Sequence, residues 1–155
     1  MKDGNIIKIN TVEEFTALLG CPPANHPLIS ICRLADIKDF ESIDKPVQLN
    51  LYFIVIKDGT NCTAKYGWRE YDFARGLMSF FAPGQMHLWS EQATQTNSWG
   101  WMLVFHPDFI RKYALGTKIG KLKFFSYETS EALHISDAER SKVEALMEGI
   151  YNEYK

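Results

Sequence analysis

The side chains best suited to metal binding or proton transfer are four widely spaced histidines, His26, His87, His106 and His134. A metal site needs several ligands that converge, and such ligands commonly lie close together in the sequence. No HxH, HxxxH or HExxH pattern occurs in this chain. His87 and His106 could meet in a folded barrel, but their spacing does not require it. The sequence therefore predicts no metal site and no bound cofactor.

The three cysteines, Cys21, Cys32 and Cys62, give no sign of nucleophilic catalysis. Their number is odd, and no CxxC pair occurs. The chain also lacks the GxSxG pattern of a nucleophilic serine and the glycine-rich loop that cradles phosphates. We expect reduced, partly buried thiols in a cytoplasmic protein that is not an enzyme.

The charge balance argues against direct contact with nucleic acid. Seventeen Lys and Arg residues oppose 19 Asp and Glu residues, which gives a formal net charge of −2 over 155 residues. The pI is about 6.1, whereas a duplex-binding domain usually has a pI above about 9. No secretory signal opens the chain, and no apolar run reaches the ~18 residues of a membrane span. We therefore expect no membrane partner and no direct DNA contact from this segment.

Aromatic residues make up 14% of the chain, and they both favour strands and line small-molecule pockets. In the predicted strand Val47–Ile56, Gln48, Asn50 and Tyr52 alternate with apolar residues and should share one face. If that face points into a barrel, it could hold a ligand. If it points outward, it meets water, and the alternation alone does not decide between the two.

Strands must position most of these residues. Between about positions 28 and 106, short apolar or aromatic runs are separated by Gly, Pro and polar turn residues, which is typical of a β-sandwich or barrel. The predicted strands are Leu28–Leu34, Val47–Ile56, Cys62–Gly67, Trp68–Phe73, Leu77–Ala82, Gln85–Trp89 and Trp99–Phe105. The polar segment Glu91–Asn97 is expected to be a solvent-exposed loop.

Helices are predicted at both ends of the chain. A capping box from Thr11 to Glu14 begins a helix over 12–19, which Gly20 ends. Pro107 begins another helix that Gly116 should end. A second capping box, from Ser136 to Glu139, begins a helix with apolar residues at three- and four-residue steps: Val143, Leu146, Met147, Ile150, Tyr151 and Tyr154. This stripe packs either on its own barrel or on a second copy.

Several stretches together resemble the cupin-like N-terminal domain of AraC-type bacterial transcription regulators. They are Tyr66–Gln85 (YGWREYDFARGLMSFFAPGQ), Gly100–Ile110 (GWMLVFHPDFI), Phe124–Glu128 (FFSYE) and Glu131–Ser136 (EALHIS). Each motif is weak alone, but the combination is distinctive, and the resemblance covers about His26 to Lys155. It implies a mainly β fold with α-helices: a cupin-like antiparallel β-barrel, or double-stranded β-helix, followed by C-terminal helices.

The resemblance also implies an organisation and a function. Residues 1–20 would form an N-terminal arm with a short helix, residues 21–106 the barrel, and residues 107–155 a helical dimerisation and packing segment. A DNA-binding domain with two helix-turn-helix motifs is expected beyond residue 155. The chain would then be the effector-sensing and dimerisation domain of a cytoplasmic regulator. It would act as a homodimer, bind a small molecule such as a sugar or an aromatic acid, and reach DNA only through the further domain.

The expected ligand-binding residues are Asn50, Tyr52, Tyr66, Trp68, Met78, His87 and Trp101. The expected dimer-interface residues are Leu146, Met147, Ile150 and Tyr154. Cupin enzymes hold a metal with two closely spaced histidines, a glutamate and a later histidine, and here only Glu70, Pro83-Gly84 and His87 match that pattern. No catalytic residue is therefore predicted. Two alternatives stay open: a stand-alone cupin enzyme (a metal-dependent isomerase or dioxygenase), and a dimerisation module whose barrel is filled.

Overall fold

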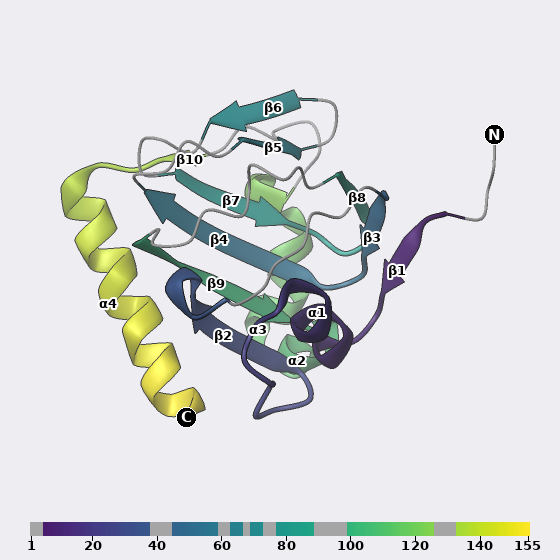
Figure 1. Ribbon diagram of the computed structural model, residues 1–155. Helices are drawn as coiled ribbons and strands as arrows, with labels where there is room; N and C mark the ends of the chain where they lie inside the picture. Colours follow the sequence, from purple (N-terminus) through teal and green to yellow (C-terminus); the bar gives the residue numbers. More distant parts are fainter. Residues whose placement is uncertain are drawn as a thin grey trace.

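The computed structural model describes residues 5–37, 45–58, 63–66, 69–72, 77–88, 99–125 and 133–155. The strands within these residues form two five-stranded sheets (Figure 1). The first sheet has, in order, β1 (Ile7–Ile9), β3 (Val47–Leu49), β8 (Gln85–Leu88), β5 (Thr63–Tyr66) and β6 (Arg69–Asp72). The second sheet has, in order, β10 (Leu133–His134), β7 (Leu77–Phe81), β4 (Tyr52–Asp58), β9 (Trp99–Phe105) and β2 (Ile29–Arg33).

Strand pairing is antiparallel except between β1 and β3, which run parallel. In the second sheet β4 lies at the centre, where Phe53 is opposite both Phe81 of β7 and Val104 of β9. No described strand is hydrogen bonded in both sheets. The fold is therefore a mixed α and β structure with two antiparallel-rich sheets, and the described strands do not form one closed, hydrogen-bonded barrel.

The main hydrophobic core lies between the two sheets. Val47 and Leu49 of the first sheet are fully buried there, together with residues of the second sheet such as Phe53. Helix α1 (Val12–Leu19) covers one side of this core. Its Phe15 ring is fully buried and lies 5.2 Å from the Phe53 ring. Burial of one such ring contributes about 1.5–3 kcal/mol to stability. Because Phe15 lies in the expected N-terminal arm, part of that arm belongs to the same core as the sheets.

A second cluster covers the opposite face of the second sheet. It is built by α2 (Pro107–Ile110), α3 (Ala114–Lys118), the 3₁₀ turns η3 (Ile119–Lys121) and η4 (Lys123–Phe125), and α4 (Asp137–Tyr154). Figure 1 shows α1 on one side of the second sheet, α2 and α3 on the other, and α4 in yellow along one end. The buried side chains of the cluster are Ile31, Ile56, Met78, Trp101, Leu103, Phe105, Ile110, Ile119, Phe125 and Met147.

The predicted strand Val47–Ile56 is two strands in different sheets. β3 ends at Leu49 and β4 begins at Tyr52. At the turn between them, the Asn50 amide donates to the Ile9 carbonyl at 2.9 Å. Because the chain passes from one sheet to the other here, the alternation does not continue through the turn. The prediction that Gln48, Asn50 and Tyr52 share one face is therefore wrong.

The structure confirms both capping boxes. The Glu14 amide donates to Thr11 Oγ1 at 3.1 Å, and the Glu139 amide donates to Ser136 Oγ at 3.2 Å. Gly20 ends α1 in the left-handed conformation, with φ of 68°. Left-handed backbone favours glycine, which has no Cβ to collide with the carbonyl oxygen.

Gly116 does not end a helix, because it lies inside α3. A Cβ at this position would lie 2.3 Å from the Ile110 carbonyl oxygen. The glycine therefore permits α2 and α3 to approach closely. The other predicted strands agree with the structure to within a few residues, whereas β1, β10 and the 3₁₀ turn η1 (Leu34–Asp36) were not predicted. Glu91–Asn97 lies outside the described residues.

Candidate functional site

His87 is a predicted pocket residue that the structure places beside the core between the sheets. It lies on β8 opposite Val47, and its ring meets the Phe81 ring edge-on, with centroids 4.7 Å apart. Its side chain is 2% exposed. Burial lowers the pKa of the imidazole from 6.5 to about 4, because a low-dielectric surrounding disfavours the charged form. The ring is neutral at pH 7 and has one donor and one acceptor nitrogen.

Tyr52, Met78 and Trp101 lie on the other face of the second sheet, under the helices. The Tyr52 ring stacks on Phe105 with centroids 5.2 Å apart. Trp101 is 2% exposed and contacts the ring of Tyr151 in α4 at 5.5 Å. These three residues hold the helical layer on the sheet and do not line the space between the sheets.

The remaining pocket candidates are Asn50, Tyr66 and Trp68. Asn50 lies in the turn between β3 and β4, where its Nδ2 donates to Asn10 Oδ1 at 2.6 Å. The side-chain amide of Asn50 thus connects this turn to Asn10, the residue just before the N-cap of α1. Tyr66 belongs to β5, and its backbone is opposite Arg69 and His87. The Tyr66 side chain and the whole of Trp68 lie outside the described residues.

Lys57 and Ser79 are buried polar side chains that the sequence analysis missed. They are 8% and 5% exposed. Alternation along β4 puts Lys57 on the face of Val55, and alternation along β7 puts Ser79 on the face of Phe81, toward the core between the sheets. The sequence signal for Lys57 was a lysine near the end of an apolar strand. Its inward direction can be deduced only once β4 is known to begin at Tyr52.

The apolar stripe of α4 divides between two environments. Met147 is buried against the second sheet, with Val143, Tyr151 and Tyr154 partly buried around it. Of the other expected interface residues, Leu146 is 68% exposed and Ile150 is 37% exposed. The Tyr154 hydroxyl accepts a hydrogen bond from the backbone amide of Asn25 at 2.7 Å. Two of the four expected interface residues therefore pack within their own chain, and two are exposed.

Arg33 of β2 holds α4 by several contacts. Its guanidinium lies 5.0 Å from the ring centroid of Trp101 and 5.8 Å from that of Tyr151. It also pairs with the Glu148 carboxylate at 3.2 Å. Each contact alone is modest at a half-exposed position, but together they link the position of α4 to that of β2 and β9.

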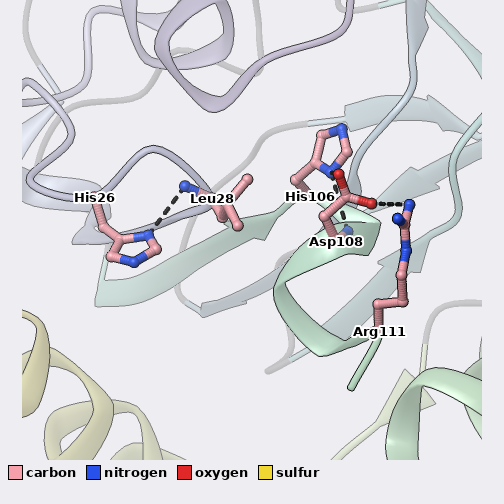
Figure 2. Close-up of polar contacts among 5 residues, drawn as sticks. All are labelled: His26, Leu28, His106, Asp108 and Arg111. Carbon is pink, nitrogen blue, oxygen red and sulfur yellow. Dashed lines mark hydrogen bonds and ion pairs between the residues drawn. The ribbon is translucent and has the colours of Figure 1, made fainter. Parts of the chain in front are cut away.

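Two histidines outside the core, His26 and His106, act as backbone caps, and Figure 2 shows both with their partners. Each precedes a proline, and each ring accepts through Nδ1 from the amide two residues later: His26 from Leu28 and His106 from Asp108, both at 3.0 Å. The His106 amide in turn donates to the Leu28 carbonyl at 2.9 Å. Proline has no N–H, so the ring reaches the next available donor. The repeated His-Pro pair was the sequence signal for this structural role.

A cleft of about 480 Å³ opens beside α1. Its lining residues are Glu13, Thr16, Ala17, Cys21, Pro23, Ala24, Asn25, His26 and Pro27. A hydrogen bond with Cys32, together with burial, raises the pKa of the Cys21 thiol well above its usual range. This thiol stays protonated and is a poor nucleophile, since the thiolate is the reactive form. Cys21 and Cys32 are free thiols, and Cys62 lies outside the described residues.

The described residues contain neither a group of side chains that could hold a metal ion nor a helix that could span a membrane. No group of three or more His, Cys, Asp or Glu side chains there is placed to hold a metal ion. None of the helices in the same part of the chain has both the length and the apolar character to cross a membrane.

Comparison with known proteins does not assign the chain to a family. No protein-family model, no curated protein and no solved structure matches the chain. The resemblance to AraC-type regulators is therefore supported by the sequence motifs alone.

Proposed function

We propose that this chain is the effector-sensing and dimerisation domain of an AraC-type transcription regulator, with a cupin-like cup of two sheets and a helical outer layer. The observation that carries the proposal is the position of α4. One side of this helix is docked on the second sheet through Met147, while Leu146 and Ile150 remain exposed on another side. Large apolar side chains exposed together on one helix are typical of an interaction surface.

The exposed side of α4 is self-complementary. We call it the α4 face: Lys142, Ala145, Leu146, Gly149, Ile150 and Glu153, all of which are exposed. In an antiparallel pair with a two-fold axis near the middle of the face, Leu146 of one copy would contact Ile150 of the other, and Lys142 would lie opposite Glu153. A side chain at Gly149 would meet no atom within 4 Å, so a second helix has room to approach.

Sensing would use the same strands that support α4. β4 and β9 pack against the helical layer on one face and against the core on the other. Lys57, Ser79 and His87 are buried polar groups beside that core, which suits an effector that carries a carboxylate or hydroxyl groups. A ligand bound there would act through different affinities for two positions of α4.

The dimerisation half is tested with a reporter. The chain is fused to a DNA-binding domain that represses transcription only as a dimer. We expect repression with the wild-type chain and its loss with the double variant Leu146→Asp, Ile150→Asp. The control Ser141→Asp, Asn152→Asp adds the same charge to exposed positions of α4 outside the α4 face and should retain repression. Equal repression by both variants would contradict the proposed interface.

The sensing half is tested by thermal unfolding with a library of sugars and aromatic acids. A ligand present at 100 times its Kd should stabilise the chain by about 2.7 kcal/mol. The response to a carboxylate ligand should be lost in Lys57→Met. If no compound in the library stabilises the chain, the result favours a filled interior and a domain that only dimerises.

A further inference from the structure

Positive charge is concentrated in the segment of residues 107–125, which covers the second sheet. This segment has five Lys and Arg residues and one acidic residue, a net charge of +4, whereas the rest of the chain has twelve basic and 18 acidic residues, a net charge of −6. The single acid, Asp108, already pairs with Arg111. The chain as a whole is slightly acidic, so its net charge conceals a strongly basic surface.

The packing of the segment directs its lysines outward. Ile110, Ile119 and Phe125 are buried against the second sheet. The basic side chains between them are exposed: Arg111, Lys112, Lys118, Lys121 and Lys123. The elements α2, α3, η3 and η4 each have five residues or fewer, and they pack on one face of the second sheet.

Large apolar side chains are exposed among these cations. Tyr113 is 68% exposed, Leu115 45%, Leu122 39% and Phe124 49%. We call this surface the basic–apolar face: Lys112, Tyr113, Leu115, Lys118, Lys121, Leu122, Lys123 and Phe124. Single exposed apolar residues are ordinary, but several within one short basic segment are typical of an interaction site.

We propose that the basic–apolar face binds the surface of an anionic lipid bilayer. Lipid phosphates attract lysines, and the boundary with the acyl chains accepts Tyr, Leu and Phe side chains. A DNA duplex offers phosphates, but its hydrated backbone provides nothing apolar for Leu115 and Leu122. The inference does not depend on dimerisation or effector sensing.

The expectation of no membrane partner rested on the absence of a long apolar run. That criterion concerns segments that span a bilayer. It does not address a surface that folding assembles from short turns, which lies in the interface without crossing it.

The test is co-sedimentation of the purified chain with lipid vesicles. We expect binding to vesicles of phosphatidylcholine and phosphatidylglycerol in equal amounts, no binding to pure phosphatidylcholine, and a sharp decrease at about 0.5 M salt, where charges are strongly screened. Duplex DNA at the same phosphate concentration should bind more weakly than the mixed vesicles. Absence of binding to the mixed vesicles, or tighter binding to DNA, would overturn the proposal.

Matched variants distinguish binding by the basic–apolar face from a general effect of the protein's charge. Lys118→Glu with Lys121→Glu should lower the vesicle partition coefficient by at least roughly 25-fold, since each lysine near an anionic surface contributes about fivefold. Lys8→Glu with Lys45→Glu makes the same charge change at exposed positions elsewhere and should have a much smaller effect. Leu115→Ser with Leu122→Ser should also weaken binding, while retaining salt sensitivity. Equal losses in the two charge-reversal variants would refute a localised site.

Discussion

Three histidines with described side chains show how the same residue type serves different roles. His26 and His106 each cap the backbone after a proline, so their Nδ1 atoms are occupied as acceptors. His87 is buried beside the core and neutral at pH 7. The spacing of the histidines does not indicate which role each of them has. Their individual roles depend on burial and on the proline that follows, which a search for ligand motifs does not consider.

The buried His87 should make stability depend on pH. Its pKa is about 4 in the folded chain and about 6.5 when unfolded, so the unfolded chain takes up a proton first as the pH falls. Stability should therefore be lost between about pH 6.5 and pH 4, by up to about 3 kcal/mol. Urea unfolding at several pH values measures this, with His87→Leu as the reference that removes only this group. Parallel pH profiles for the two proteins would show that His87 does not titrate as described.

Gly100 of β9 should tolerate substitution poorly. Its φ is 152°, and a Cβ there would lie 2.2 Å from the Ile56 carbonyl oxygen and 2.6 Å from Leu34 Cδ1. We expect Gly100→Ala to destabilise the chain by about 1–3 kcal/mol or more. Gly149→Ala, in open space on α4, should instead stabilise it by about 0.5–1 kcal/mol. Urea titration compares the two, and a similar effect at both positions would contradict this packing.

At the scale of elements, α4 shows what periodicity can and cannot establish. The capping box fixes where the helix begins, and the hydrogen bonds from Ser136 to the Glu139 carboxylate lower the pKa of that group. The apolar stripe was also predicted correctly. However, the stripe is wide, and three- and four-residue steps do not tell which part docks on the sheet. The contacts of Arg33, Trp101 and Tyr151 decide this, and they join segments far apart in the sequence.

Neighbouring residues of α4 should therefore differ in how much they contribute to stability. Met147→Ala removes a side chain that is 5% exposed and should cost about 2–5 kcal/mol of stability. Leu146→Ala removes one that is 68% exposed and should cost less than about 0.5 kcal/mol. Thermal unfolding at low protein concentration measures the intrachain effect. Comparable destabilisation by both substitutions would mean that the helix docks in another orientation.

At the scale of the whole molecule, local patterns predicted most elements but not how the sheets are divided. Gly, Pro and alternation located the strands from β2 to β9 to within a few residues. The turn at Asn50 and Leu51, where the chain changes sheets, contains no glycine or proline, so two strands were taken as one. This error grouped Tyr52 with Gln48 and Asn50 on one face, although Tyr52 lies under the helical layer. β1, with three residues, is too short for alternation to identify it.

The outer surface presents two chemically different faces. The α4 face carries balanced charge and suits a second copy of the chain. The basic–apolar face carries a strong positive charge and suits an anionic surface. Neither follows from total composition, because a net charge of −2 averages over both.

Sedimentation equilibrium of the purified chain tests the central claim most directly. At micromolar to tens of micromolar concentration, the wild-type chain should sediment with twice its mass of 17.8 kDa, and Leu146→Asp with Ile150→Asp should sediment as a monomer of unchanged thermal stability. A wild-type chain that remains monomeric over this range, or a double variant that still forms dimers, would contradict the account.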